Sequence, residues 1–475
     1  MKGRGAVKKL LAFDFGASSG RAILGEYENG ALTYREIHRF ENNPIEENGH
    51  LRWNFPELMG EVYRALELAG PVDSIAFDTW GVDFGLLDEN GNLLEKPVHY
   101  RDSRTQHTME KAFSVMSAQD LYAATGSQLM AINTLFQLME TDLSKAKQVL
   151  FMPDLFAYQL CKKAVCEQSI ASTSQMLDLQ KKTWSEAVLS AFEIPKEIFA
   201  PLVQSGTVIG EYQGAKVVSV AGHDTQSAVA AMPAQGENSA FLSCGTWSLF
   251  GCELDAPVLT AQSREAEMSN ELGANGKINY LKNITGLWLI QESRRQWQRE
   301  GKAYSFGEIA AMAEQAEPMK CFIDVNAPQF AAPGDVPERI REYCRETGQF
   351  VPQSVGEVAR CIYESLAWQY RATFLEMQNI TGKRFETLHI LGGGCQAALL
   401  CQLTADALGV PAQAGPVEAT ALGNLLLQLK ALGEIDSLAE GRAMIQKIET
   451  VTQYVPKDSE RWARAERFFR KGEST

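Results

Sequence analysis

One pattern occurs twice along this chain: an apolar strand, a turn of small residues, and a returning apolar strand. At the amino terminus Leu10–Phe15 is the first strand, Gly16-Ala17-Ser18-Ser19-Gly20 is the turn, and Arg21–Tyr27 is the returning strand. Asn29-Gly30 is a two-residue hairpin signal that leads into a third strand over Ala31–Phe40. This segment therefore predicts an antiparallel three-stranded meander.

The pattern returns in the second half of the chain. Ala240–Cys244 is an apolar strand, Gly245-Thr246 is a small polar turn, and Trp247–Glu253 is the returning strand. Each half also has a later apolar strand that opens into a glycine-containing turn and a helix, Val217–Val220 in the first half and Thr387–Leu391 in the second. The repetition predicts two related α/β domains.

The candidate linker between the two halves is Ala231–Ser239, which holds a proline and a glycine. We therefore predict one domain over residues 1–234 and a second over residues 235–475, each of an ordinary domain size. The charged segment Asp458–Arg470 also carries aromatic residues, which predicts an amphipathic closing helix.

Charge and hydropathy exclude several classes of protein. The chain has 45 basic and 59 acidic side chains, a formal net charge of −14, and no Lys/Arg-rich block, so neither nucleic acid nor an anionic membrane is favoured as a partner. No apolar run approaches the roughly 18–20 residues that cross a bilayer. The apolar run Leu10–Phe13 is too short for the core of a signal peptide. The sequence thus predicts a cytoplasmic protein.

The nine cysteines are scattered, with no C-x-x-C pair and no histidine spacing suited to zinc. They predict neither a metal site nor a disulfide framework. Cys344 and Cys361 are expected on neighbouring elements, where a bridge is conceivable. Buried free thiols are the alternative that a reducing compartment favours.

Asp14 stands just before the first small turn. Backbone N–H groups of such a turn can approach phosphate oxygens closely. A carboxylate beside it repels phosphate unless a divalent cation lies between them, which indicates Mg²⁺ with a nucleotide. For this turn alone, an ordinary hairpin is the alternative. The second turn, Gly245-Thr246, favours the nucleotide, because two equivalent turns can close on a polyphosphate from opposite sides of an interdomain cleft.

Asp224 follows an apolar strand at the start of an Ala-rich helical pattern, between His223 and Thr225. A carboxylate at this point can accept a proton from a hydroxyl that attacks phosphorus. The structural alternative is a helix-capping aspartate. His223 by itself is more typical of a hydrogen-bonding structural histidine than of a catalyst.

Three other segments have a functional and a structural interpretation. Trp80, between Asp78 and Asp83, either fills the core or stacks on a sugar. The segment Tyr100-Arg101-Asp102-Ser103-Arg104 is either a solvated loop or the rim of a sugar site. The run from Gly392 to Ala397 fits the dinucleotide fingerprint G-x-G-x-x-A, which leaves a nicotinamide-dependent dehydrogenase as a minor alternative. The acid that the fingerprint requires on the next strand is missing.

Together, these motifs resemble the FGGY family of carbohydrate kinases, within the actin/hexokinase/Hsp70-type ATPase fold. The resemblance implies two related ribonuclease H-like (actin-like ATPase) domains with a catalytic cleft between them. The motifs that carry it are DFGASSGR (Asp14–Arg21), REIHRF (Arg35–Phe40), DTWGVDF (Asp78–Phe84), YRDSRT (Tyr100–Thr105), NTLFQL (Asn133–Leu138), MPDLFAY (Met152–Tyr158), GHDTQSAV (Gly222–Val229), GTWSL (Gly245–Leu249), NITGLWLIQE (Asn283–Glu292), GGGCQ (Gly392–Gln396) and GPVEATALGN (Gly415–Asn424).

The resemblance also implies roles for individual residues. Asp224 would be the catalytic proton acceptor, and Asp14 would hold Mg²⁺ through water. The sugar-binding residues would be Gly81, His223, Asp224, Thr225 and Asn283. The nucleotide-binding residues would be Ala17, Ser18, Ser19, Gly20, Arg21, Thr246, Gln291 and Gly393.

Among substrates, the combination of DTWGVDF, YRDSRT and GHDT points to L-rhamnulose. The expected reaction transfers the γ-phosphoryl group of MgATP to O1 of this ketose and gives L-rhamnulose 1-phosphate and ADP, a step of L-rhamnose catabolism. L-Fuculose, L-xylulose and L-ribulose are alternative substrates, and a non-catalytic sugar or nucleotide sensor on the same fold is an alternative function. The expected partners are the ketose and ATP, without nucleic acid or membrane, in a monomer or small homo-oligomer.

Overall fold

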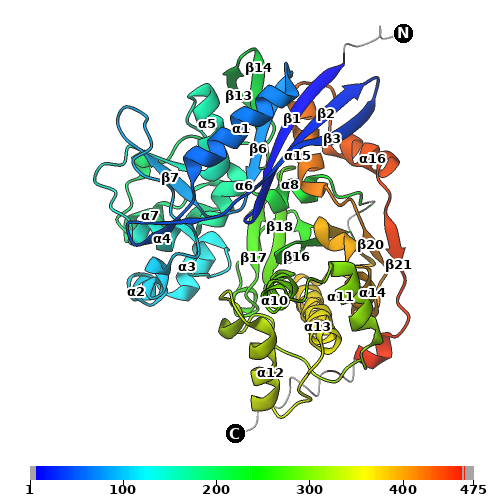
Figure 1. Cartoon of the computed structure of the whole chain (residues 1–475). Coiled ribbons are helices and arrows are strands. Elements are labelled where there is room, and N and C mark those ends of the chain that lie inside the picture. Colours follow the sequence, from blue (N-terminus) through cyan, green and yellow to red (C-terminus); the bar gives the residue numbers. More distant parts are fainter. Residues whose placement is uncertain (1–6, 235, 237, 463–464, 466–475) are drawn as a thin grey trace. The chain divides into compact units, whose positions relative to one another are not determined.

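The structure is a computed structural model, and it describes residues 7–234, 236, 238–462 and 465. The chain divides into two compact units (Figure 1). The first unit comprises Met1–Pro233, Glu253–Leu281 and Glu418–Glu449, and the second comprises Ala234–Cys252, Lys282–Val417 and Thr450–Thr475. The main segment of the first unit thus ends inside the linker expected from the sequence, and two later segments of the chain join this unit.

The first unit is built on a six-stranded mixed sheet with the order β13-β14-β6-β1-β2-β3. Strands β1, β2 and β3 pair antiparallel in sequence, so the predicted meander is confirmed. β6 pairs parallel with β1 and with β14. The strands span Lys8–Phe15 (β1), Ser19–Glu28 (β2), Ala31–Glu41 (β3), Ser74–Thr79 (β6), Thr207–Tyr212 (β13) and Ala215–Ser219 (β14).

Side chains of β1 alternate between two apolar layers, as the pleat of a strand requires. Phe13 and Phe15 stack on aromatic rings of β6 and of α5 (Met152–Cys161). The alternate residues of β1 belong to a buried cluster formed largely with α15 (Ala419–Ala431). Asp14 continues this second set at the carboxyl end of the strand, so its carboxylate emerges on the side covered by α15.

Helix α15 packs against α8 (Asp224–Ala230) and against strands β1 and β6. A glycine makes the helix pair possible, because a Cβ atom at Gly423 would overlap the backbone oxygen of Ser227 in α8. The other helices of the first unit are α1 (Phe55–Ala69), α2 (Thr108–Val115), α3 (Ala118–Thr125), α4 (Thr134–Met139), α6 (Gln168–Ala171), α7 (Glu186–Ala191), α9 (Ala261–Glu265) and α16 (Leu438–Ile448).

A second mixed sheet has seven strands in the order β17-β18-β16-β15-β19-β20-β21. β15 pairs antiparallel with β16 and parallel with β19, and β19 pairs parallel with β20. β15 therefore has the same relation to its neighbours as β1, which confirms the repeated α/β pattern. The strands span Ser239–Cys244 (β15), Trp247–Leu254 (β16), Ser269–Leu272 (β17), Ile278–Thr285 (β18), Thr387–Leu391 (β19), Ala412–Ala414 (β20) and Thr452–Tyr454 (β21).

Five helices lie wholly within the described residues of the second unit, and among them α13 packs against α11 and α14 (Figure 1). They are α10 (Trp288–Arg299), α11 (Phe306–Gln315), α12 (Val336–Glu346), α13 (Val355–Thr381) and α14 (Ala398–Leu408). None of the described helices in either unit is long and apolar enough to cross a membrane. The predicted closing helix over Asp458–Arg470 falls mostly outside the described residues, and residues 459–462 within it are helical.

Three buried cysteines converge in the second unit. Cys321, Cys344 of α12 and Cys361 of α13 each offer a sulfur, and the three sulfurs lie within 4.8 Å of one another. All three are free thiols. Cys344 and Cys361, which the sequence analysis expected on neighbouring elements, thus do lie close together. Cys321 joins them through tertiary packing, which the spacing of cysteines in the sequence did not indicate.

Candidate active site

Two aspartates lie side by side where β1 and β6 end. Asp14 and Asp78 are register partners of the parallel pair, and both are buried. Asn424 of α15 donates its amide to Asp78 Oδ2 at 2.6 Å, whereas Asp78 Oδ1 is buried without a hydrogen-bond partner among the described residues. Burial and the nearby charge of Asp14 raise the pKa of Asp78 well above its ordinary value. The site thus has an acidic floor that favours a cation.

Arg21 connects this acidic floor to α15. Its guanidinium donates to Asp14 and, through the other terminal nitrogen, to Glu418 just before α15. Burial opposes the positive charge, but Asp14 and Glu418 outweigh it and raise the pKa of Arg21. Of the residues expected to hold phosphate, Arg21 is therefore fixed beside the residue expected to hold the metal.

Asn42 fixes the turn between β1 and β2 through two hydrogen bonds to backbone carbonyl groups of the turn. The backbone of Asn42 donates to Ser18 at 3.2 Å, and its side-chain amide donates to the Gly16 carbonyl at 3.0 Å. Gly20 is required here, since a Cβ atom would overlap the ring of Phe40. Ser18 at the tip is exposed. Ala17, Ser18 and Ser19 thus form an accessible turn next to Asp14.

Asp224 is the first residue of α8, one position after the N-cap residue His223. Its Oδ1 accepts a local hydrogen bond from the Thr225 backbone at 2.6 Å and lies 3.4 Å from the Thr225 hydroxyl. The side chain is 31% exposed, and His223 Nε2 lies 3.5 Å away. Burial raises the pKa of Asp224 to about 6, lowered in part by His223 and raised further by Asp14. Asp224 is thus a carboxylate with access to solvent and a basicity suited to proton transfer near neutral pH.

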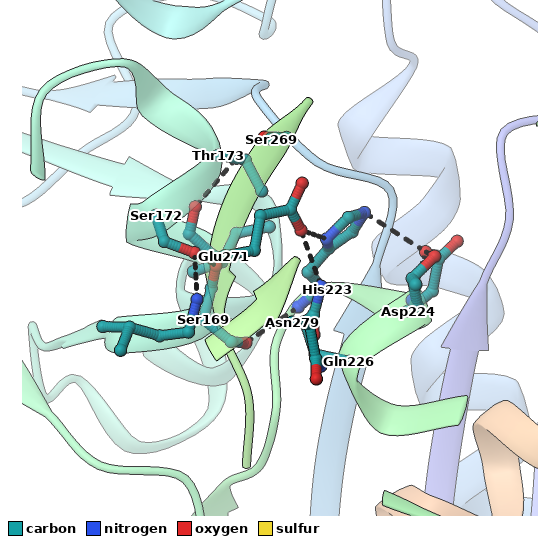
Figure 2. Close-up of polar contacts among 12 residues, drawn as sticks. Ser169, Ser172, Thr173, His223, Asp224, Gln226, Ser269, Glu271 and Asn279 are labelled. Carbon is teal, nitrogen blue, oxygen red and sulfur yellow. Dashed lines mark hydrogen bonds and ion pairs between the residues drawn. The ribbon is translucent and has the colours of Figure 1, made fainter. Parts of the chain in front are cut away.

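His223 lies between Asp224 and a buried carboxylate, as Figure 2 shows. Its Nδ1 is 2.8 Å from Glu271 Oε2. A Cβ atom at Gly81 would lie 3.5 Å from His223 Nε2 and 3.3 Å from the Thr173 methyl group. The structure therefore brings together Gly81, His223, Asp224 and Thr225, four of the five residues that the sequence analysis expects to bind the sugar.

The second small turn, Gly245-Thr246, is anchored within the second unit. The Thr246 hydroxyl donates to Gln291 Oε1 of α10 at 3.3 Å, and the backbone amides of Gly286 and Trp288 both donate to the Thr246 carbonyl. Two of the expected nucleotide-binding residues, Thr246 and Gln291, are thus in direct contact. Asn283 lies in β18, on its part that belongs to this unit.

In the glycine triplet before α14, Gly394 packs closely against a neighbour, whereas Gly393 has free space around it. A Cβ atom at Gly394 would overlap the Cys244 side chain, whereas nothing lies within 4 Å of such an atom at Gly393. Gly392 has a φ of 80°, which favours glycine. Gly393, the residue expected to line the nucleotide pocket, is thus exposed and free of steric cover.

Two segments with an open interpretation have buried members that hydrogen-bond within the first unit. Trp80 is 5% exposed, and its indole N–H donates to Asp83 Oδ2 at 3.0 Å, so the ring fills the core. Asp102 is 8% exposed and accepts from the Leu51 backbone at 2.8 Å. Arg104 donates to Gln137 Oε1 at 2.7 Å. These contacts make the segment a fixed connection and not a solvated loop.

Sequence reasoning assigned no role to several residues of this site. Asn424 and Glu418 lie inside the motif Gly415–Asn424, but the motif did not indicate a chemical role for either residue. Glu271 lies in no motif, and no local signal marks it. Glu167, also buried, accepts from the Gly222 backbone at 2.9 Å and so fixes the loop that leads into His223.

Solved structures share this fold. A gluconate kinase from Lactobacillus acidophilus aligns with a TM-score of 0.77 at 16% identity, over 98% of this chain and 96% of that chain. A glycerol kinase from Plasmodium falciparum with ADP aligns with a TM-score of 0.76 at 14% identity, over 98% of this chain and 97% of that chain. At this identity the likeness concerns the fold, and it confirms the expected actin-like ATPase class of two α/β domains.

Curated relatives match the sequence over nearly its full length. A rhamnulokinase of Bacteroides thetaiotaomicron is 42% identical, over 96% of this chain and 97% of its own length. A rhamnulokinase of Bacillus subtilis is 39% identical, over 95% of this chain and 96% of its own length. The N-terminal domain of the FGGY family of carbohydrate kinases matches residues 9–232, and the C-terminal domain of the same family matches residues 240–432. With both domains matched in order and relatives of about 40% identity matched over nearly their full length, this chain belongs to the FGGY family of carbohydrate kinases.

Proposed function

We propose that the chain transfers the γ-phosphoryl group of ATP to O1 of L-rhamnulose and forms L-rhamnulose 1-phosphate and ADP. The observation that carries this substrate is the identity of about 40% to rhamnulokinases over at least nine-tenths of both chains. The quoted segments DTWGVDF, YRDSRT and GHDT support it. A kinase of this kind catalyses an early step of L-rhamnose breakdown.

The chemistry falls to Asp224. Its carboxylate accepts the proton of the O1 hydroxyl as the new oxygen–phosphorus bond forms and the bond from phosphorus to the leaving ADP oxygen breaks. Phosphoryl transfer has a loose transition state, so catalysis comes mainly from positioning and charge stabilisation. The open turn of Ala17, Ser18 and Ser19, with Arg21, would position the phosphates.

The acidic floor fits Mg²⁺, a hard cation that prefers oxygen ligands. The observation in favour is Asp78 Oδ1, a buried oxygen without a hydrogen-bond partner among the described residues, next to the Asp14 carboxylate. Asp14 would hold the ion through water. When bound, Mg²⁺ neutralises phosphate charge, and this explains how a chain with a net charge of −14 accepts ATP.

The pH dependence of the reaction should follow Asp224. The pKa of this carboxyl lies at about 6 instead of 3.8, and only the ionised form can accept a proton. We expect kcat/KM for the sugar to be constant near neutral pH and to fall about tenfold per unit well below pH 6. Initial rates between pH 5 and pH 8 measure this. A rate that stays constant down to pH 5 would contradict the assignment.

A panel of ketoses tests the substrate. ADP release is measured with L-rhamnulose, L-fuculose, L-xylulose and L-ribulose at equal concentrations, and we expect the highest kcat/KM for L-rhamnulose. A higher kcat/KM for another ketose would show that this ketose is the preferred substrate, and the proposed phosphoryl transfer would still hold. Sugar or ATP binding without ADP release from any of the four would instead favour the sensor.

A further inference from the structure

A chain of buried polar groups lies behind Asp224. In Figure 2, Glu271 and Asp224 stand on opposite sides of the His223 ring. Glu271 Oε2 also accepts from the Gln226 amide at 2.6 Å, and Asn279 donates in turn to Gln226. All the members except Asp224 are at most 7% exposed. Glu271 comes from β17 and His223 from the start of α8, so two separate elements meet here.

We propose that Glu271 is a positioning residue that keeps His223 an imidazolium with its Nε2–H directed at the sugar. This inference rests on the proposed function, because it assigns a role at the same site. Glu271 does not touch the reacting atoms and acts through His223 alone.

The burial and the hydrogen bonds of Glu271 favour a positive charge on His223. A buried carboxylate is unfavourable unless it is paired or hydrogen-bonded. Among the described residues, the Glu271 carboxylate bonds to the side chains of Gln226, which is neutral, and of His223, which can carry a positive charge. Burial opposes the charge on His223, but Glu271, followed by Asp224 and Glu167, outweighs burial and raises the pKa of His223 above its ordinary value of 6.5. Asp14 is the further acidic group that acts on Asp224.

The geometry also fixes the direction of the donor. Because Nδ1 is engaged by Glu271, the proton available to a ligand is on Nε2. That nitrogen lies 3.5 Å from Asp224 Oδ1, on the side where Gly81 has no side chain to cover it. With Asp224 placed at the O1 hydroxyl, His223 would donate to the oxygen on the adjacent carbon of the ketose. The sugar group recognised here is therefore a hydrogen-bond acceptor, a carbonyl or hydroxyl oxygen at C2.

Nuclear magnetic resonance of the free, full-length protein tests the charge of His223 without any substrate. The chain has six histidines, and a His223→Asn variant assigns the ring signals of this one. We expect both ring nitrogens of His223 to carry protons at pH 7. If His223 is neutral at pH 7 in the wild-type protein, the proposal is wrong, whatever the variants do.

Glu271→Gln then separates charge from shape, because the amide has the same size and can still hydrogen-bond Nδ1. We expect His223 to become neutral at pH 7. The KM for the ketose should rise about tenfold, the difference between a charge-assisted and a neutral hydrogen bond, while the KM for ATP stays unchanged. Glu271→Asp keeps the charge and should restore the imidazolium signal and part of the affinity.

The matched control is Glu364→Gln, which removes another buried carboxylate, one paired with Arg360 in α13. It should lower thermal stability without changing the His223 signal or the KM for the ketose. A folded Glu271→Gln protein with an unchanged His223 signal and an unchanged KM for the ketose would overturn the proposal. Failure of the proposed function looks different, since it would appear as a wild-type protein that releases no ADP with any ketose.

Discussion

An Asp224→Asn variant is expected to bind sugar within a few-fold of the wild-type affinity while its turnover falls by roughly 10²–10⁴, the usual loss when general-base help is removed. Asparagine keeps the size of the side chain and can still accept a hydrogen bond from the Thr225 backbone, but it cannot take the O1 proton. Steady-state ADP release gives kcat, and calorimetric titration with the ketose gives the affinity.

Stability serves as the internal control for this variant. The pKa of Asp224 rises from 3.8 to about 6 in the folded protein, so its contribution to stability is present at low pH and is lost as the pH rises through about 6. At pH 7 the charged form is therefore disfavoured in the fold, and the neutral amide should leave the melting temperature equal or higher. Near-normal turnover in a folded variant would refute the role of Asp224.

Asp335→Asn is a matched comparison in the second unit. Asp335 caps α12 through its own side chain, which accepts from the Glu338 backbone at 2.9 Å. Asparagine caps helices as well as aspartate does. Turnover and melting temperature should both stay close to the wild-type values, which would show that the loss in Asp224→Asn is specific to its position.

Gly423→Ala is expected to destabilise the protein by about 1–3 kcal/mol, the usual effect of forcing a methyl group into a packed core. The added Cβ would overlap the backbone oxygen of Ser227, and backbone cannot move aside as a flexible side chain can. The helices α15 and α8 must therefore separate. Because α8 begins with Asp224 and α15 carries Asn424, activity should fall with stability. Chemical denaturation and ADP release measure the two effects.

Gly60→Ala is the control for that substitution. Gly60 lies in the middle of α1 on an exposed surface, and nothing lies within 4 Å of an added Cβ. Alanine should stabilise this helix by roughly 0.5–1 kcal/mol. If the Gly423→Ala and Gly60→Ala variants had the same free energy of unfolding, α15 could not pack against α8 as closely as the structure shows.

Short-range sequence patterns were sufficient to predict the strand that comes first along the chain in each of the two large sheets. Apolar runs gave β1 and β15, and the Asn29-Gly30 signal gave the hairpin between β2 and β3, where both residues have positive φ. These features depend on residues adjacent in sequence, so local chemistry decides them. The residue types of the first turn and of Asp224 likewise indicated phosphate and proton chemistry before any contact was known.

Burial in the structure distinguishes between the two roles that the sequence pattern allowed for Trp80. The sequence analysis left Trp80 compatible with the core and with a sugar, and the structure places its ring in the core, where its N–H donates to Asp83. The two interpretations share one sequence signature, because an indole flanked by acids suits both environments. Only the neighbours of the ring distinguish them.

Sequence patterns alone predicted the two-fold repetition of α/β units, the kinase family, and the carboxylate expected to take the proton. Only tertiary packing placed Glu271 behind His223, Asn424 on Asp78 and Glu418 on Arg21. In the second unit, packing also brought three thiols together. The physical reason is distance along the chain. A turn or a strand is specified by neighbours a few residues away, whereas the charge and hydrogen bonds of a buried site come from elements 48 to 397 residues apart that only packing joins.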